Sequence, residues 1–397
     1  MPIQSASGLV LAVRREASYG VLPANDAQAR VIPYVSHSLA LSKSAIASEE
    51  IRSDFQRATM RHGNRTLSGE LQLQLQTGTY SEMMASALRR EFTPVASITG
   101  LTCTASTTAP HFTRAAGSWI ADGLRVGMCV RFSGFTAGGL SNNGKNFTIT
   151  ALTATQMTVA EAVAARTGDI AVQCSVPGRV TWMPTTGHTQ TSFAVEEWKP
   201  DVPRSHRHLG LRVNTMQVGL PPNARATLAF GMLGRDSAVQ STRYFTGATI
   251  PPASVMQVGH NGALIVNGAS LGVVTALQIN VTNNMEVGQT VGSNVTPDVF
   301  HGPMEVTGSF TLYEESGAFY DVFDQESEIS LMARVTDDTS VNSGFLQLAL
   351  PRIKLAGGSY STSNQSRLQS FDFTALLHPG TAGNEATTML LQDSSLT

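Results

Sequence analysis

The segment from Leu67 to Arg90, LSGELQLQLQTGTYSEMMASALRR, decides the fold because its pattern returns later in the chain. From Thr307 the sequence reads TGSFTLYEESGAFYDVFDQES, which aligns on Ser68 onward without a gap. In both copies an alternating apolar and polar run predicts a half-buried strand, and a glycine turn and an apolar-rich helical segment follow it. Two copies of one supersecondary unit predict a duplicated domain.

Composition bounds the class of protein. A chain of 397 residues exceeds the size at which one core keeps growing, so two or three domains are expected. Charged residues make up 14% of the chain, against roughly 25% in an ordinary soluble protein. The formal net charge of −2 excludes a strongly basic protein that holds nucleic acid by neutralising its phosphates.

The cysteines and the hydropathy of the sequence bear on the redox compartment and on membrane insertion. Cys103, Cys129 and Cys174 show no metal-type spacing, and their odd number argues against a disulfide framework. A reducing compartment is therefore the simpler interpretation. No run of about 18 apolar residues appears, so we expect no membrane span.

The spacing of comparable strands locates an insertion. In the second copy, ISLMARV and GFLQLALPRIKLAGG follow the helical segment almost at once, whereas in the first copy SFAVEEW and HLGLRVNTMQVG arrive only after position 190. About 100 extra residues must therefore follow the first helix. We predict a first domain from residues 1–92 and 191–250, an inserted domain at 93–190, and a second domain with a C-terminal arm at 251–397.

The segments around these strands predict loops and a small extra fold. Short strands separated by Gly and Asn turns make the insert a small β-barrel or sandwich. Turn-forming residues in 1–33 predict an irregular arm. The polar stretch from Ser44 to Arg65 is too long for a tight hairpin, so we expect an extended loop, and Asn283 to Gly302 takes the same place in the second copy. Such long loops are usually functional.

Two motifs invite a catalytic or metal-binding interpretation. GASLG matches the nucleophile-elbow pattern around Ser270, but a β-type run follows where that mechanism needs a helix. A turn that enters a strand is the simpler interpretation. His206 and His208 could share one strand face as metal ligands, yet no third ligand is implied, so a polar edge or loop is favoured.

Adjacent carboxylates such as Glu196 and Glu197 point to opposite faces of a strand and form no acid/base pair by themselves, so solvated charge is their simplest interpretation. No phosphate-binding loop, dinucleotide fingerprint or zinc pattern is present. We therefore expect no catalytic, cofactor-binding or metal-binding residues and no enzymatic activity.

The repeated strand offers a different kind of surface. Glu70, Gln72, Gln74 and Gln76 lie opposite a face of leucines. Taken alone, this pattern is typical of an ordinary solvated sheet face. Its functional interpretation is a smooth, polar, non-basic wall, because Lys or Arg would bind a DNA backbone tightly whereas amides and scattered carboxylates let it pass.

Four stretches together resemble the tail tube (major tail) proteins of long-tailed bacteriophages. They are EASYGVLP (16–23), EEIRSDFQRATMRHG (49–63), SGELQLQLQTGTYSEMMASALR and VTGSFTLYEESGAFYDVF. The resemblance covers both outer copies, about three quarters of the chain. It implies two tandem tail-tube-type β-sandwich units, each with a flanking α-helix, while the insert resembles the small β modules that decorate such proteins.

The resemblance also implies how the protein works. Subunits would form rings whose inner strands join into a β-barrel around a DNA channel, and long loops would stack the rings. The strands at 67–76 and 306–315 would then belong to the ring sheets. Candidate lumen-facing residues are Glu70, Gln72, Gln74, Gln76, Ser309 and Thr311. Candidate ring-stacking residues are Ile51, Arg52, Asp54, Phe55, Arg57, Val287, Val291 and Asn294.

Ring symmetry follows from the duplication. Single-copy subunits of this family form hexamers, so two copies per chain imply a trimer with pseudo-sixfold symmetry, and a hexamer is the less favoured alternative. Implied partners are further copies of the chain, other tail proteins and double-stranded DNA in transit. The implied location is the virion tail, assembled in the host cytoplasm. The competing hypothesis is a carbohydrate- or receptor-binding β protein of a tail tip or cell surface, with the insert as its binding module.

Overall fold

The computed structural model describes residues 3–5, 8–136, 140–251, 255, 257–272, 274–314, 317–363 and 366–397. Within them the chain forms an 18-stranded sheet, a closed barrel and a two-stranded hairpin. The only helices longer than one turn there are α1 (Ser81–Ala87) and α2 (Ala318–Asp324), one in each copy. The prediction of a mainly β fold is confirmed.

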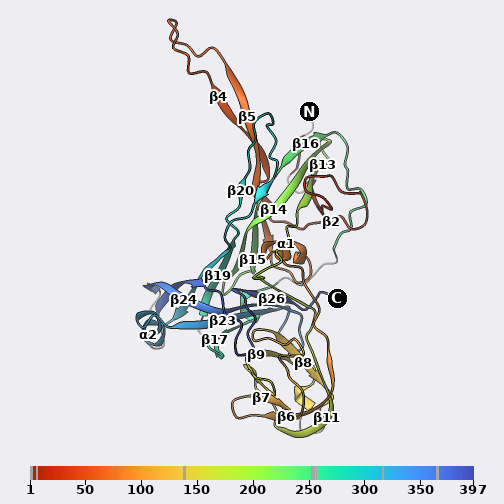
Figure 1. The fold of residues 1–397 in the computed structure, drawn as a ribbon, viewed down its shortest axis with the longest axis vertical. Coiled ribbons are helices and arrows are strands. Elements are labelled where there is room, and N and C mark those ends of the chain that lie inside the picture. The colour runs from red at the N-terminus through yellow and green to blue at the C-terminus, as the bar shows by residue number, and fades with distance from the viewer. Residues whose placement is uncertain are drawn as a thin grey trace.

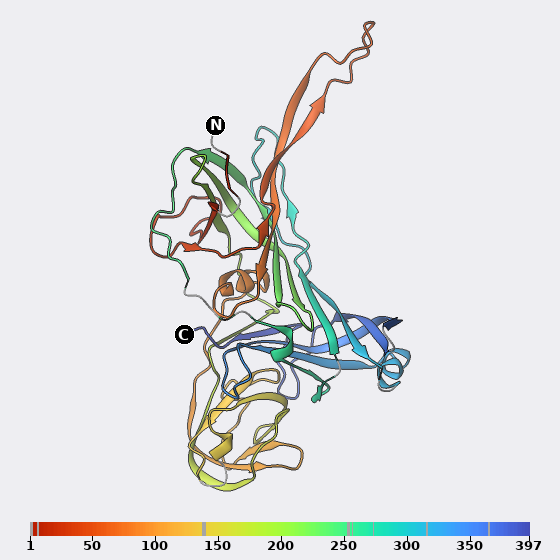
Figure 2. The same cartoon turned by 180° about the vertical axis from the view of Figure 1, so that it is seen from behind.

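The elements divide into two repeats and an insert (Figures 1 and 2). The strands around the first repeat are β1 (Val10–Arg15), β2 (Arg30–Val31), β3 (Ser36–His37), β4 (Ala40–Ala47), β5 (Met60–Gln74), β12 (Arg179–Trp182), β13 (Phe193–Lys199), β14 (Arg204–Leu220), β15 (Thr227–Gly234) and β16 (Asp236–Gln240). Those of the second are β17 (Gly262–Val266), β18 (Ala269–Leu271), β19 (Val274–Thr282), β20 (Glu286–Val287), β21 (Val299–Phe300), β22 (Glu305–Tyr313), β23 (Glu328–Thr336), β24 (Phe345–Ser363), β25 (Ser366–Ala375) and β26 (Leu390–Asp393).

Strand pairing shows that the two repeats share one topology. β13 pairs with β14, β14 with β15 and β15 with β5, just as β23, β24, β25 and β22 pair in the second repeat. Phe230 lies opposite Leu71 as Phe371 lies opposite Phe310. Even a bulge recurs, between Val213 and Thr215 in β14 and between Leu355 and Gly357 in β24. The equivalence therefore extends well beyond the aligned sequence.

Two strand pairings join the repeats, β12 with β26 and, in the long sheets, β14 with β19. The C-terminal half of β14, Thr215–Leu220, pairs antiparallel with Leu277–Thr282 of β19. This pairing produces a continuous row of strands in the order β4, β5, β15, β14, β19, β22, β25, β24. We call these eight strands the inner sheet.

Apolar side chains on one face of the inner sheet form the main core. Leu71, Phe230, Met216 and Val281 are successive cross-strand partners, and each is at most 1% exposed. The helix α1 packs on this face with six buried residues, whereas no residue of α2 is buried. The first helix is therefore part of the core, and the second lies at the margin of the sheet (Figure 1).

The expected loop from Ser44 to Arg65 is strand at both ends, whereas residues 48–59 form the irregular tip, so the prediction needs correction only at the ends. Ala45 pairs with His62 and Ala47 with Met60, so β4 and the first half of β5 form a long ribbon that projects from the body (Figure 1). Its side chains are largely exposed on both faces. Alternating hydrophobicity, the usual strand signal, is therefore missing.

Both expected arms contain strands of the 18-stranded sheet. In the N-terminal segment, β1 pairs with β13, and Leu11 at its centre is fully buried. In the C-terminal segment, β26 pairs with β24 and β12 and is buried along its length. β26 flanks the N-terminal half of β24 as β16 flanks that of β14.

The insert is a six-stranded barrel, which agrees with the predicted small β fold. Its strands are β6 (Ile98–Ser106), β7 (His111–Arg114), β8 (Cys129–Ser133), β9 (Asn146–Leu152), β10 (Gln156–Val159) and β11 (Arg166–Ser175). The chain enters and leaves it at one point, because Thr93 and Val180 exchange two backbone hydrogen bonds. It lies at the opposite end of the molecule from the ribbon (Figure 1).

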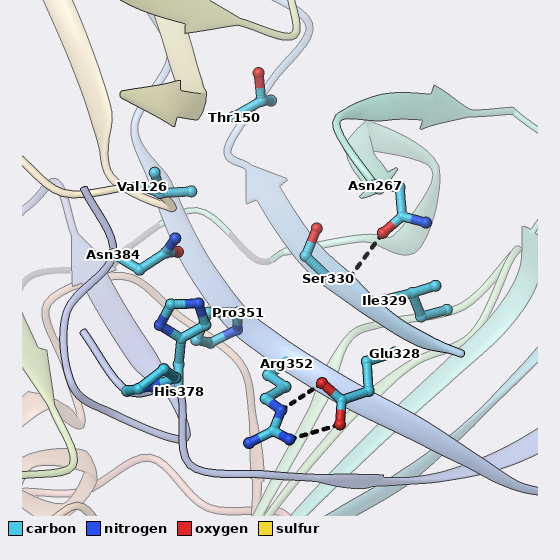
Figure 3. Close-up of a pocket in the computed structure, with 11 residues that line it drawn as sticks. Val126, Thr150, Asn267, Glu328, Ile329, Ser330, Pro351, Arg352, His378 and Asn384 are labelled. Atoms are coloured by element: carbon cyan, nitrogen blue, oxygen red, sulfur yellow. Dashed lines mark hydrogen bonds and ion pairs between the residues drawn. The ribbon is translucent and has the colours of Figure 1, made fainter. Parts of the chain in front are cut away.

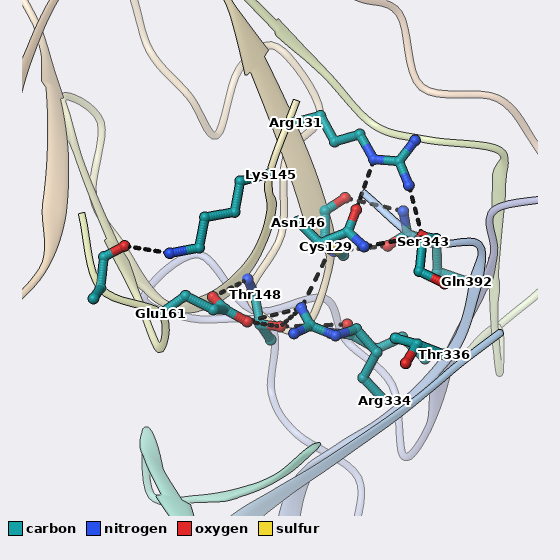
Figure 4. A network of polar contacts seen from close by, with 12 residues as sticks. Cys129, Arg131, Lys145, Asn146, Thr148, Glu161, Arg334, Thr336, Ser343 and Gln392 are labelled. Atoms are coloured by element: carbon teal, nitrogen blue, oxygen red, sulfur yellow. Dashed lines mark hydrogen bonds and ion pairs between the residues drawn. The ribbon is translucent and has the colours of Figure 1, made fainter. Parts of the chain in front are cut away.

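Buried polar contacts fix the insert on the second repeat (Figure 4). Arg334 of β23 forms an ion pair with Glu161 at 2.7 Å and donates a hydrogen bond to Thr148 at 2.9 Å. Gln392 of β26 donates to the Cys129 carbonyl and accepts from the Cys129 N–H. Removing one partner of such a buried set leaves the other unsatisfied, so the insert is held in one orientation.

The repeats differ at two β14 positions, of which one is half-buried and the other buried. The strand register equates His206 and His208 with Leu348 and Leu350 of β24. His208 is only 2% exposed, and its burial lowers its pKa from 6.5 to about 4, with the nearby Glu197 carboxylate partly opposing this. The first repeat therefore carries an acid-sensitive group where the second carries a leucine.

This difference predicts an acid-sensitive fold. Because the pKa of His208 is lower in the folded chain than in the unfolded chain, the stability that depends on its neutral form is fully present above pH 6.5. This stability is lost as the pH falls toward 4. The loss from His208 between pH 7 and pH 5 should be about 2 kcal/mol. Substituting His208→Leu should remove this part of the pH dependence, measured as the free energy of unfolding in denaturant at both pH values.

A matched control is His62→Leu, which replaces an exposed histidine of β5 and should leave the pH dependence unchanged. His301, whose burial also lowers its pKa to about 4, should keep a residual dependence in both variants. An equal loss of stability in His208→Leu and the unaltered chain would contradict the assignment.

Candidate functional site

The inner sheet presents one polar face that crosses both repeats. Residues directly opposite each other in antiparallel strands share a face. One such row runs through six strands as Gln74, Thr227, Gly219, Gln278, Ser309 and Asp372. A second row contains Gln72, Ala229, Gln217, Asn280, Thr307 and Thr374. We call the surface formed by these rows and their flanking residues Glu70, Thr311 and Ser370 the polar face.

The structure brings together most of the residues predicted to face a lumen. Glu70, Gln72 and Gln74 of β5 lie on the polar face with Ser309 and Thr311 of β22, although more than 230 positions separate the two groups. Gln76 lies two residues past the end of β5 and accepts a hydrogen bond from Thr79. The expected strand at 306–315 ends at Tyr313, and residue 315 lies outside the described residues.

Neighbouring polar groups on this face satisfy one another. Gln72 donates a hydrogen bond to Glu70 at 2.8 Å, and the hydroxyls of Thr311 and Ser370 lie 2.8 Å apart. Gln278 donates to Asn280 at 3.3 Å. These side chains bond to one another along the strands and across them, so the polar face is in part a hydrogen-bonded layer.

The residues named above for the polar face include carboxylates but no cation. Glu70 and Asp372 are the charged residues among them. The second row continues into β24 at Lys354, which lies directly opposite Thr374. Lys354 and Arg212 of β14 are each paired with a carboxylate at 3.0 Å or less. A surface of this kind releases few counterions from a nucleic acid and so binds it weakly.

The predicted stacking residues divide between the ribbon tip and a second loop. Ile51, Arg52, Asp54, Phe55 and Arg57 lie at the tip, between β4 and β5, and all are exposed. The side chains of Ile51 and Phe55 are 102% and 98% exposed, and Phe55 adopts a φ of 57°. Arg52 and Asp54 form an ion pair at 2.9 Å, and this hydrogen bond lowers the pKa of Asp54. Two apolar side chains thus stand unsupported at the end of an ordered ribbon.

The second loop lies against the base of the ribbon. β20 and β21 form a small hairpin in which Val287 pairs with Val299. Beyond it, Val291 is fully exposed, and the carbonyl of Asn294 accepts a hydrogen bond from the Arg65 N–H at 2.9 Å. The loops of both repeats therefore project from the same side of the molecule (Figures 1 and 2).

The catalytic and metal-binding hypotheses gain no support. Ser270 is exposed in the middle of β18, a hairpin strand, so the strand, turn and helix of a nucleophile elbow are missing. His206 and His208 belong to a strand rather than a polar loop, and within the described residues no group of three metal-ligating side chains surrounds them. No helix in the described part of the chain is long and apolar enough to cross a membrane.

Glu196 was expected to be solvated and is instead 1% exposed, and one group of the neighbouring strand and two groups distant in sequence donate hydrogen bonds to it. These are the Ser205 hydroxyl and the backbone N–H groups of Tyr244 and Phe245. Glu197 is 6% exposed and pairs with Lys199 at 3.1 Å. No local sequence signal indicates such partners, so these buried structural carboxylates could not be recognised from the sequence.

An open cavity of about 550 Å³ lies between the insert and the second repeat (Figure 3). Val126 and Thr150 of the insert face Glu328 and Arg352, which form a bidentate ion pair with each other. Trp, Tyr and Phe are absent from its described lining. Because ligand pockets usually present apolar and aromatic surface with free polar groups, this cavity does not favour the carbohydrate-binding hypothesis.

Comparison with known proteins identifies the family. No match was found among curated proteins. A family model described as "Phage tail tube protein" matches residues 6–375, which cover both repeats and the insert. The match agrees with the mainly β fold of the chain. The chain therefore belongs to the phage tail tube protein family.

Proposed function

We propose that copies of this chain close into rings, that the rings stack into a hollow tail tube, and that the polar face lines its channel for double-stranded DNA. The continuity of the polar face across both repeats carries this proposal, because a single face whose lysine is paired with a carboxylate lets a polyanion pass without binding it tightly. Membership of the tail tube family supports it.

Strand number favours three chains in each ring. Three inner sheets of eight strands give roughly 24 strands, and at a spacing of about 4.8 Å these enclose a circle roughly 37 Å across, before strand tilt widens it. That circle accommodates a double helix and the side chains around it. Six chains in each ring would enclose a circle about twice as wide, which is wider than a double helix requires. The ring is therefore a trimer with pseudo-sixfold symmetry.

The ribbons supply the contact between rings. Each ribbon extends the inner sheet beyond the body of the subunit and ends in exposed Ile51 and Phe55 (Figure 1). Burying two such side chains against the next ring contributes roughly 2 kcal/mol or more for each. Repeated in every subunit, this contact holds one ring on another.

The family is structural, so the role is mechanical rather than catalytic. The protein is a component of the virion tail, assembled in the host cytoplasm with other tail proteins. The insert, whose two chain connections meet at one point far from the ribbon, lies on the outside of the tube, where it leaves the bore open.

The first prediction is assembly itself. Purified protein examined by negative-stain electron microscopy should show rings or hollow tubes, because each free sheet edge finds a partner in another copy. Protein that stays monomeric at high concentration, under several nucleating conditions, would count against the proposal.

The second prediction concerns the channel. Gln74→Lys, Gln278→Lys and Ser309→Lys together would place cations along one row of the polar face. Tubes of this variant should retain short duplex DNA at low salt and release it as the salt concentration rises, measured by co-sedimentation. Unaltered tubes should retain little at any salt concentration.

The matched control for this variant carries Gln74→Asn, Gln278→Asn and Ser309→Thr, which preserve the polar, uncharged surface. It should behave as the unaltered protein does. Equal DNA retention by the lysine variant and this control would show that the polar face does not meet the DNA.

The third prediction concerns stacking. Ile51→Ser with Phe55→Ser should leave rings intact but prevent long tubes, because the apolar contact with the next ring is lost. Val341→Ser, which changes another exposed apolar residue, should form normal tubes. Tube length in negative stain measures the effect, and full-length tubes from the tip variant would contradict the assignment.

A further inference from the structure

The two outer edges of the inner sheet are equivalent to the two strands that already meet inside the chain. By strand register, Gly357–Thr362 of β24 corresponds to Thr215–Leu220 of β14. The segment His37–Ser42, which contains the end of β3 and the start of β4, corresponds to Leu277–Thr282 of β19. Internally, those two equivalents pair with each other.

Both edges lack a partner strand within the described residues. Gly357–Thr362 pairs only with β25, and His37–Ser42 pairs only with β5. Ser38 donates its backbone N–H to Glu70 of β5, so in an alternating ladder the backbone groups of Leu39 and Leu41 face away from β5. Exposed edges of this kind are templates for pairing with another chain.

We infer that the ring closes when Gly357–Thr362 of one copy pairs antiparallel with His37–Ser42 of the next, in the register of the internal β14–β19 junction. Transferring that register places Ser359 opposite Ala40, Tyr360 opposite Leu39 and Gly357 opposite Ser42. This inference rests on the proposed ring and specifies the partner surface, the strand direction and the register.

A cavity beside the free edge supports the same pairing. An open space of about 600 Å³ lies along the segment from His37 to Leu41 and is also lined by His206, His208 and Glu197. At the internal junction Val218, which lies opposite Ile279, is 2% exposed and packs in the main core with Leu348 and Leu350. The first repeat thus has open space at the position where, in the second repeat, the C-terminal half of β14 pairs with β19.

Tyr360 is the side chain that fits this space. It is equivalent to Val218 but is 44% exposed, and the transferred register directs it to the face that carries Leu39. Leu39 lines the cavity. Neither ring nitrogen of the buried His208 has a hydrogen-bond partner within the described residues, and Nδ1 of His37 also lacks one. A phenol hydroxyl that enters the cavity can donate to one of these nitrogens.

Polarity therefore distinguishes the two kinds of junction. Inside the chain, Val218 belongs to the same apolar core as Leu348 and Leu350, whereas at the proposed ring closure Tyr360 meets histidines at the positions equivalent to these leucines. A tyrosine needs a polar partner when buried, and a valine does not. The histidines of β14 thus become part of the subunit interface.

Cysteine cross-linking in assembled rings tests the register. Ser359→Cys with Ala40→Cys places both thiols on the polar face, directly opposite each other, where a disulfide can form under a mild oxidant. Non-reducing gels should show chains linked in twos and threes. Ser359→Cys with Ser42→Cys, displaced by two residues, should link at least about tenfold less, and each single variant gives the background of the three native cysteines.

Two results would separate failure of the register from failure of the ring. If negative stain shows rings but the displaced cysteine pair cross-links as well as the opposite pair or better, the proposed register is wrong and the proposed ring is retained. Absence of rings from the unaltered chain would overturn the proposed function and this interface together.

Tyr360 gives an independent measurement of the same interface. Tyr360→Ala should raise the protein concentration needed for assembly of the subunit ring about tenfold or more. Tyr360→Phe keeps the aromatic side chain but removes its hydroxyl, so it should raise that concentration less. Assembly of Tyr360→Ala at the concentration that suffices for the unaltered chain would overturn the seating of Tyr360 in the cavity.

Discussion

The backbone pairing of β14 with β19 is the interaction on which the rest of the structure depends. β12 and β26 also pair across the repeats, but only the β14–β19 pairing makes the inner sheet continuous, and without it each repeat would have a further unpaired sheet edge. With it, strands from both repeats lie in one register, so polar residues line up on one face and apolar residues on the other. The core, the polar face and the position of both free edges all follow from this junction.

Low charge is the second constraint. In the proposed tube, the polar face cannot carry many unpaired cations, since these would hold the DNA in place. Charged residues make up only 14% of the chain, and the cations at the margin of the polar face are paired. Amides and hydroxyls supply the remaining polarity and satisfy each other locally.

The sequence predicted what depends on periodicity. The alternation of Leu71 and Leu73 with Gln72 and Gln74 indicated a sheet with one buried face, and its return near Phe310 indicated the duplication. Strand spacing also predicted the insert and its β character. Each of these features leaves a repeated, local signal in the residue order.

Features that depend on distant partners left no such signal. The ribbon is exposed on both faces, so nothing in its pattern separates strand from loop. The burial of Glu196 requires donors from residues 205, 244 and 245, which only the folded chain brings together. The strand β26 is short and follows a polar segment, yet it fills the edge of β24.

The central claim is that one sheet junction, used once inside the chain, is used again between chains. A cryo-electron microscopy map of the assembled tube, resolved well enough to separate strands in a section across the axis, tests it most directly. The account predicts an unbroken barrel of inner strands, three outer insert densities in each ring, and the same strand spacing at internal and external junctions. A barrel interrupted between subunits, or six inserts in each ring, would contradict it.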